Sequence, residues 1–239
     1  LKESFKKVFD GVDIDYIKWD FNRHLSEVGS KYLPADRQDE VFYRYQLGVY
    51  DLYTWFRKTY PHLMIENCSG GGGRYDLGMM ALSNQIWTSD NTFAKSRVYI
   101  QYGTSLAYPA STMSCHVSDP GKENTLAELD YKFKVALGGM LGYELNILEQ
   151  PEAVKTQINT QIELYRQVEE LIKCGDLYRL LSPFDHEGGT SAYYYTDPHC
   201  PQNRILLSFL QNVGPHYPTT YRLPIRVADV TARYRDAIS

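Results

Sequence analysis

The chain has 239 residues, 43% of them hydrophobic and 14% aromatic, which is enough to bury a sizeable core. A formal net charge of −4 and a pI near 5.9 argue against a basic nucleic-acid-binding surface, and the longest apolar runs are too short to cross a membrane. Four cysteines lie far apart without a CxxC pair, which favours reduced thiols in a cytoplasmic protein over a disulfide framework or a zinc site.

Hydrophobic periodicity predicts strands and helices that alternate through the first three quarters of the chain. Strands are expected over residues 12–20, 63–66, 85–88, 114–117 and 140–147. Helices are expected over residues 1–11, 39–60, 93–107 and 126–137, with a long helix beginning at Pro151. Asp36 or Asp39 would cap the second helix. This alternation is typical of an α/β protein with a parallel sheet and helices outside it.

The composition changes beyond about residue 182. Short strands over 192–196, 204–211 and 221–230 are separated by prolines, which predicts an antiparallel β module without crossover helices. We therefore expect two domains, 1–180 and 181–239. The chain begins at Leu1 and ends just after a predicted strand, so we expect a piece of a longer protein.

Polar or reactive side chains lie at or near the ends of four of the predicted parallel strands: Asp20, Cys68, Asp90 and His116. Because parallel strands end at one edge of a sheet, this pattern favours a (β/α)8 barrel, which places its catalytic residues there. A doubly wound sheet is expected to carry a phosphate-binding fingerprint, which the sequence lacks. Five β/α units are too few for a whole barrel, so about three are expected on the N-terminal side.

Each of these residues also has a plainer interpretation. The stretch Ile14–Arg23, which carries Asp20, could be a strand followed by a solvated loop. Ser89, Asp90 or Asn91 could cap the helix that follows. His116 could serve in a structural hydrogen bond, and Glu144 in the fifth strand could be structural too.

A run of four glycines, residues 70–73, follows the second predicted strand. Glycine lets a backbone approach a ligand closely or adopt positive φ. The run has no Walker or dinucleotide spacing, so a nucleotide site is not indicated. Charged residues and Cys68 flank it, which favours a functional loop over a flexible surface loop.

Several motifs resemble those of glycoside hydrolase family 36, the microbial α-galactosidases. Residues 18–23 read Lys-Trp-Asp-Phe-Asn-Arg and resemble the family's KWDMNR motif. Residues 66–76 and 85–92 resemble its ENCxxGGGRxD and QxWTSDNT motifs, and residues 101–106 and 116–118 follow in the family's order. The resemblance is strong from about residue 12 to residue 147.

The resemblance implies the C-terminal part of a (β/α)8 barrel, about strands 4 to 8, followed by the start of an antiparallel β domain. It implies that Asp20 is the catalytic nucleophile and Asp90 the general acid/base. The remaining residues expected to bind the sugar are Lys18, Trp19, Phe21, Asn22, Cys68, Gly70 and Trp87. No cofactor is implied, and the scattered histidines form no metal-binding pattern.

The implied activity is retaining hydrolysis of terminal α-galactosyl residues in melibiose and raffinose-family oligosaccharides, by double displacement. The alternatives are an α-N-acetylgalactosaminidase or a galactosyl transferase of the same family, or a non-catalytic sugar-binding fragment. Cys68 beside the sugar's 2-position favours galactose with a free hydroxyl. The expected partner is an α-galactoside, without nucleic acid or membrane, and the full-length protein is expected to be a homotetramer.

The spacing itself adds one inference about charge. Lys18 lies two residues before Asp20 and therefore on the same side of the strand, where its charge would favour an ionised Asp20. The family's further sugar-gripping residues come from upstream segments that are not in these 239 residues. We therefore expect this chain to be inactive by itself.

Overall fold

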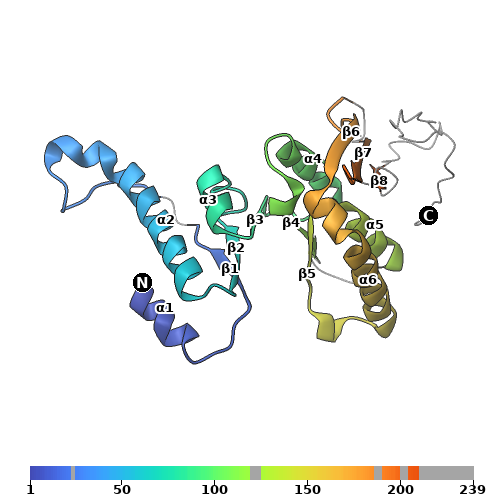
Figure 1. Cartoon of the computed structure of the whole chain (residues 1–239), viewed down its shortest axis with the longest axis horizontal. Helices are drawn as coiled ribbons and strands as arrows, with labels where there is room; N and C mark the ends of the chain where they lie inside the picture. Colours follow the sequence, from blue (N-terminus) through green and yellow to red (C-terminus); the bar gives the residue numbers. More distant parts are fainter. Residues whose placement is uncertain (23–24, 119–124, 186–189, 200–203, 210–239) are drawn as a thin grey trace. The chain divides into compact units, whose positions relative to one another are not determined.

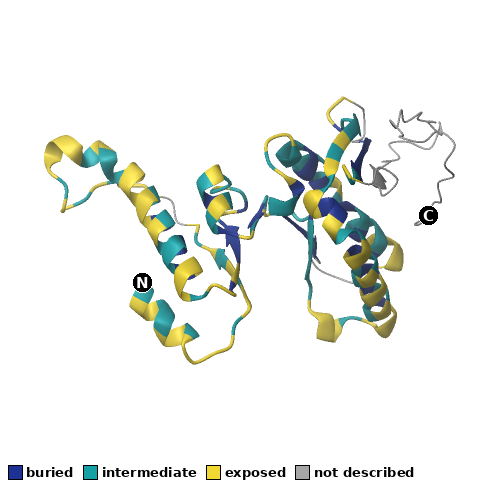
Figure 2. Cartoon of the chain, viewed as in Figure 1, coloured by how far each residue is buried: buried dark blue, intermediate teal, exposed yellow. Residues whose placement is uncertain are grey.

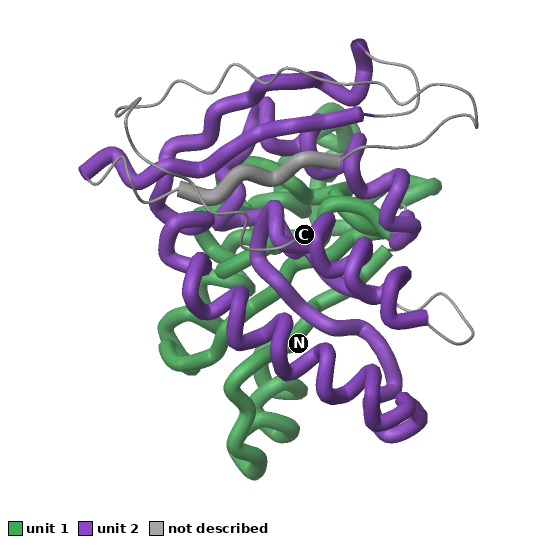
Figure 3. Tube along the Cα trace, turned by 90° about the vertical axis from the view of Figure 1, so that its right-hand side faces the viewer, with its two compact units in different colours: residues 1–90 green, residues 91–239 purple. Residues whose placement is uncertain are grey.

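The structure is a computed structural model, which describes residues 1–22, 25–118, 125–185, 190–199 and 204–209. The chain divides into two compact units, residues 1–90 and residues 91–239, coloured separately in Figure 3. Each unit has its own strands and helices (Figure 1). No helix among the described residues is both long and apolar enough to cross a bilayer.

Unit 1 contains three parallel strands in the order β1-β2-β3. Its elements are α1 (Lys2–Phe9), β1 (Tyr16–Asp20), the 3-10 helix η1 (Ala35–Glu40), α2 (Val41–Thr59), β2 (Met64–Cys68), α3 (Leu77–Leu82) and β3 (Gln85–Trp87). The register places Lys18 opposite Glu66, and Glu66 opposite Gln85. Two residues further along β1, Asp20 lies opposite Cys68.

One face of this sheet, which we call the helix face, packs against the helices of unit 1. Trp19 stacks on Tyr53 of α2 at 4.5 Å between ring centroids, and Phe5 of α1 meets the Trp19 edge at 5.2 Å. Ile65 and Ile86 are almost fully buried in the same core, and Met79 brings α3 into it. Burial of this many apolar groups is the main stabilising contribution to the unit.

The opposite face, which we call the open face, is polar. Successive residues of a strand point to opposite sides, so Lys18 and Asp20 point away from Trp19. By the same alternation Glu66 and Cys68 of β2 share the open face. Figure 2 shows β2 and β3 as buried strands and the first half of α2 as largely exposed.

Two helical details of unit 1 differ from the predictions. The N-cap residue of α2 is Glu40, and its side chain makes no cap hydrogen bond with a described residue, so the expected caps Asp36 and Asp39 were wrong. The short helix α3 was not predicted. Its N-cap is Asp76, whose Oδ1 accepts a hydrogen bond from the Met79 backbone at 3.0 Å.

Unit 2 contains two parallel strands, β4 and β5, and an antiparallel sheet, β6-β7-β8. Its elements are α4 (Ala94–Ser105), η2 (Ala110–Thr112), β4 (Met113–Ser118), α5 (Leu126–Ala136), β5 (Met140–Glu144), η3 (Ile147–Glu149), α6 (Glu152–Cys174), β6 (Asp176–Leu181), β7 (Ser191–Thr196) and β8 (Arg204–Phe209). A capping box between Thr125 and Glu128 begins α5, and the apolar stripe of α6 buries Val154, Ile158 and Tyr165.

The predicted α/β class is confirmed: five parallel strands alternate with helices, and an antiparallel sheet follows. The segment Asp176–Leu181 is the first antiparallel strand, which the predicted elements did not include. The strand expected over residues 221–230 lies outside the described residues. The domain boundary near residue 180 stays a prediction.

Candidate active site

Two rows of side chains occupy the open face of unit 1. The first row contains Lys18, Glu66 and Gln85, and the second contains Asp20 and Cys68 at the carboxyl ends of β1 and β2. In β/α barrels the carboxyl ends of the strands carry the catalytic groups. Strand pairing therefore places Asp20 where a barrel enzyme keeps its catalytic residues.

The Cys68 side chain is the close neighbour of Asp20. Its thiol is 1% exposed, and burial raises its pKa to about 11, with a further increase from the hydrogen bond and negative charge of Asp20. The thiol is consequently protonated and neutral around pH 7. Cys68 thus places a small uncharged donor, rather than a thiolate, beside the carboxylate.

The glycine run follows β2 in the chain and packs against the segment that follows β3. Gly70 and Gly71 have φ values of +54° and +80°, which side chains rarely adopt. A Cβ on Gly71 would lie 2.6 Å from the Ser89 Cα and 2.9 Å from the Asp90 backbone nitrogen. The loop therefore packs directly against the backbone that carries Asp90, and only glycine permits this approach.

Arg74 connects the ends of β1 and β2. It donates to the Phe21 carbonyl at 3.0 Å, to Ser69 Oγ at 2.7 Å and to the Cys68 carbonyl. Its guanidinium also lies 3.4 Å from the centroid of the Phe21 ring. Asn22 adds a second link, because its Oδ1 accepts from the Gly70 backbone at 2.6 Å. These contacts fix the loops beside Asp20 relative to one another.

Comparison with known proteins identifies the family. The melibiase family model matches residues 1–175. The chain belongs to the melibiase family.

Similar proteins with curated names include α-galactosidases. This melibiase chain is 45% identical over 195 residues to α-galactosidase AgaA of Geobacillus stearothermophilus, an alignment that covers 81% of this chain and 26% of AgaA. A solved variant of AgaA in complex with raffinose has a TM-score of 0.76 at 43% identity, covering 82% of this chain and 27% of that one. The α-galactosidase structure from Lactobacillus brevis has a TM-score of 0.84 at 36% identity, covering 91% and 30%.

The resemblance to glycoside hydrolase family 36 drawn from the motifs is confirmed by these matches. So is the fold, part of a β/α barrel followed by antiparallel strands. This melibiase chain spans about a quarter to a third of the length of these relatives.

Two of the residues expected to contact sugar have rings that pack on the helix face. Trp19 points into the helix-face core and stacks on Tyr53, away from Lys18 and Asp20. Phe21 packs against Trp19 at 5.6 Å and lies under the Arg74 guanidinium. The alternation that points Asp20 to the open face points Trp19 to the helix face, and a sugar contact by either ring stays a prediction.

The other expected residues keep positions compatible with a sugar site. Trp87 is buried, with the Lys18 ammonium 4.6 Å from its ring centroid. Asn22 and Gly70 are exposed at the loop ends. Asp90 is exposed too, and its interpretation as a helix cap was wrong, since α4 has Phe93 as its N-cap. Asn91 Oδ1 accepts from the Phe93 backbone at 3.2 Å, and Arg23 lies outside the described residues.

The structural interpretation of His116 and Glu144 has geometric support within unit 2. His116 Nδ1 lies 2.9 Å from Glu144 Oε1, and Ser118 Oγ donates to Glu144 Oε2 at 3.2 Å. The His116 side chain is only 7% exposed. The pair therefore holds the carboxyl ends of β4 and β5 together.

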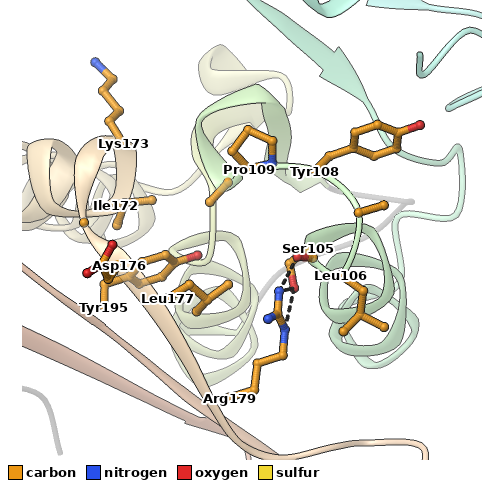
Figure 4. A pocket seen from close by; sticks show the side chains of 13 residues that line it. Ser105, Leu106, Tyr108, Pro109, Ile172, Lys173, Asp176, Leu177, Arg179 and Tyr195 are labelled. Carbon is orange, nitrogen blue, oxygen red and sulfur yellow. Dashed lines mark hydrogen bonds between the residues drawn. The ribbon is translucent and has the colours of Figure 1, made fainter. Parts of the chain in front are cut away.

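A separate cavity of about 300 Å³ lies within unit 2 (Figure 4). Its walls come from residues 105–110, which lead into β4, from the end of α6, and from β6 and β7. Figure 4 shows Arg179 directed at Ser105, to whose Oγ it donates at 3.0 Å. The cavity precedes the amino end of β4, whereas barrel enzymes bind substrate beyond the carboxyl ends. We therefore do not assign the sugar site to it.

Sequence reasoning missed one part of the site, the polar network around Glu66. Tyr16 and Gln85 both donate hydrogen bonds to Glu66 Oε2, the latter at 3.0 Å. The available signal was a glutamate within an otherwise apolar predicted strand.

Proposed function

We propose that this melibiase chain forms part of the active site of a retaining α-galactosidase that cleaves terminal α-galactosyl groups from melibiose and raffinose-family oligosaccharides. The observation that carries the proposal is the position of two aspartates in unit 1. Asp20 ends β1, and the backbone of Asp90 is packed against the glycine loop that follows β2. Identity of 45% to AgaA, and the raffinose bound in the AgaA variant, support the choice of substrate.

Double displacement gives the two carboxyl groups different tasks. The Asp20 carboxylate attacks the anomeric carbon while the Asp90 carboxylic acid donates its proton to the departing oxygen. The Asp90 carboxylate then removes a proton from water, which attacks the same carbon and releases Asp20. The net reaction adds one water across the glycosidic bond, with two inversions and overall retention.

The neighbours of Asp20 suit the nucleophile's role. A neutral, buried Cys68 thiol beside the carboxylate offers it a hydrogen-bond donor without adding a competing negative charge. The influence of Lys18 on the charge of Asp20 stays part of the proposal. The contacts of Lys18 include Glu66 at 3.4 Å and the Trp87 ring.

Azide rescue assigns the two roles separately. In Asp20→Gly, which lacks the nucleophile, azide attacks the face of the sugar that Asp20 would attack. This variant is therefore expected to yield β-galactosyl azide. In Asp90→Gly, which lacks the acid/base, azide replaces the water that attacks the glycosyl intermediate. This variant is therefore expected to yield α-galactosyl azide. The substrate is nitrophenyl α-galactoside, and the protein is expressed from its complete reading frame. The same anomer from both variants, or undiminished activity in either, would overturn the assignment.

The choice among sugars rests on Cys68. A buried thiol beside Asp20 leaves little space for an acetamido group at the 2-position. We expect nitrophenyl α-galactoside to be cleaved well and its N-acetylgalactosaminide analogue poorly, and the reverse order would favour an α-N-acetylgalactosaminidase. Incubation with galactoside and sucrose, followed by product analysis, distinguishes hydrolysis from galactosyl transfer.

The proposal extends to the protein's setting. We infer a cytoplasmic enzyme that assembles as a homotetramer, with a domain boundary near residue 180. The described cysteines Cys68, Cys115 and Cys174 are free thiols, which is compatible with a reducing compartment. Light scattering of the purified protein tests the tetramer. An assay of residues 1–239 alone tests the expectation that they are inactive in isolation.

A further inference from the structure

Glu66 is a carboxyl group in an unusual position. It lies in the middle of β2, and its side chain is 0% exposed. Burying a carboxylate costs several kcal/mol unless charge pairing and hydrogen bonds compensate. A hydrophobic residue would stabilise a strand interior at least as well, so the position calls for an explanation beyond folding.

The contacts of Glu66 divide between its two oxygens. Oε2 accepts hydrogen bonds from the Tyr16 hydroxyl and from Gln85 Nε2, the latter at 3.0 Å. Gln85 Nε2 also donates to the Tyr16 hydroxyl at 2.9 Å, so the three side chains form a closed triangle across β1, β2 and β3. This triangle fixes the carboxylate plane and directs Oε1 at Lys18 Nζ, 3.4 Å away.

Lys18 is consequently held at both sides of its ammonium group. Glu66 lies on one side, and the Trp87 ring lies 4.6 Å from Nζ. A lysine side chain has four rotatable bonds and is otherwise a mobile point charge. Its side chain nevertheless remains 32% exposed, so it is not closed off from a ligand. Lys18 also shares the open face with Asp20, two residues along the strand.

We propose that Glu66 is a positioning residue: through its contact with Lys18, and supported by Tyr16 and Gln85, it holds the ammonium where the hydroxyls of the bound sugar meet it. The inference rests on the proposed function, in which Lys18 contacts the sugar beside Asp20. In this role Glu66 needs no contact of its own with the substrate. Its effect on catalysis is exerted entirely through Lys18.

A double-mutant cycle tests this route of action. Glu66→Gln keeps the shape and an acceptor for Tyr16 but removes the charge that pairs with Lys18. Lys18→Met removes the ammonium and keeps most of the stem. In the protein expressed from its complete reading frame, each single variant is expected to lower kcat/KM for nitrophenyl α-galactoside about 10- to 100-fold, the range expected when a charged contact to the sugar is lost or misplaced.

The double variant distinguishes positioning from simple support of the fold. If Glu66 acts through Lys18, Glu66→Gln in the Lys18→Met background lowers kcat/KM no further. Two effects that multiply, or wild-type kinetics for Glu66→Gln, would overturn the proposal. Asp76→Asn provides a matched carboxylate-to-amide control, because Asp76 caps α3 and bonds Tyr50 at 2.9 Å. It is expected to lower the melting temperature and leave KM unchanged.

A second readout does not depend on catalysis. Reductive methylation of Lys18, followed by peptide mass mapping, reports how firmly the ammonium is held. Glu66→Gln is expected to raise the labelling rate of Lys18 several-fold relative to exposed lysines such as Lys58. Unchanged labelling would overturn the positioning role. Increased labelling in a protein that cleaves no α-galactoside would instead refute the proposed function and leave the positioning intact.

Discussion

Gly71→Ala tests whether the glycine loop positions Asp90. The new methyl group would lie 2.6 Å from the Ser89 Cα and 2.9 Å from the Asp90 nitrogen, whereas ordinary contacts of a Cβ are 3.4–4 Å. The backbone carrying Asp90 must therefore move by about 1 Å, and the φ of +80° adds about 1–2 kcal/mol of strain. Together with overpacking of about 1–3 kcal/mol, the free energy of unfolding is expected to fall by about 2–5 kcal/mol.

The kinetic consequence is larger than the loss of stability. A displacement of about 1 Å at a catalytic group can lower a rate about 100-fold. Because Asp90 is proposed to protonate the leaving group, melibiose should lose more activity than nitrophenyl α-galactoside, whose leaving group needs little protonation.

Two other glycine-to-alanine variants serve as controls for Gly71→Ala. Gly48 lies exposed in α2 with nothing within 4 Å of its missing Cβ, so Gly48→Ala should stabilise the fold by about 1 kcal/mol and leave activity unchanged. Gly70→Ala introduces backbone strain at φ +54° without a clash, which separates strain from displacement in thermal unfolding. A folded Gly71→Ala protein with the wild-type kcat on melibiose would refute the positioning of Asp90 by this loop.

Three further predictions concern pH and stability. Burial raises the Cys68 pKa from 9.0 to about 11, so between these pH values the folded state keeps a proton that the unfolded state loses. The free energy of unfolding, measured in urea, should therefore fall by about 2 kcal/mol between about pH 9 and 11. Cys68→Ser should lack this part of the pH dependence. Trp19→Ala should destabilise the protein by about 3–5 kcal/mol in urea while KM stays near the wild-type value, because its ring packs on Tyr53 in the core; a large rise in KM would restore Trp19 to the sugar site. Asp76→Ala should cost about 1–2 kcal/mol by thermal melting through loss of the α3 cap, and an unchanged melting temperature would contradict that role.

The alternation of strands and helices could be predicted because each apolar stripe or run is several residues long. The α6 stripe, for example, continues over 23 residues. The helix α3 escaped prediction because six residues are too few to establish a helical period. Asp76 was accordingly covered only by the motif over residues 66–76, although it caps that helix.

The catalytic candidates could be proposed from the sequence because they follow strands, but their neighbours could not. The Glu66 network depends on the register of three strands, which places Tyr16 of β1 and Gln85 of β3 beside one carboxylate. No spacing within a single strand carries that information. The direction of the Trp19 ring, by contrast, could have been predicted, since residues that alternate with Lys18 and Asp20 must face the helices.

Covalent trapping tests the central claim most directly. In a 2-fluoro galactosyl fluoride, the fluorine at the 2-position slows both chemical steps, and the anomeric fluoride departs without help from an acid. A retaining enzyme therefore accumulates its glycosyl intermediate. Peptide mass mapping of the trapped protein is expected to place one fluorogalactosyl group on the peptide that contains Asp20. The same peptide from Asp20→Asn is expected to carry no label. A label on any other carboxylate, or turnover without a covalent adduct, would contradict the assignment of Asp20 as the nucleophile.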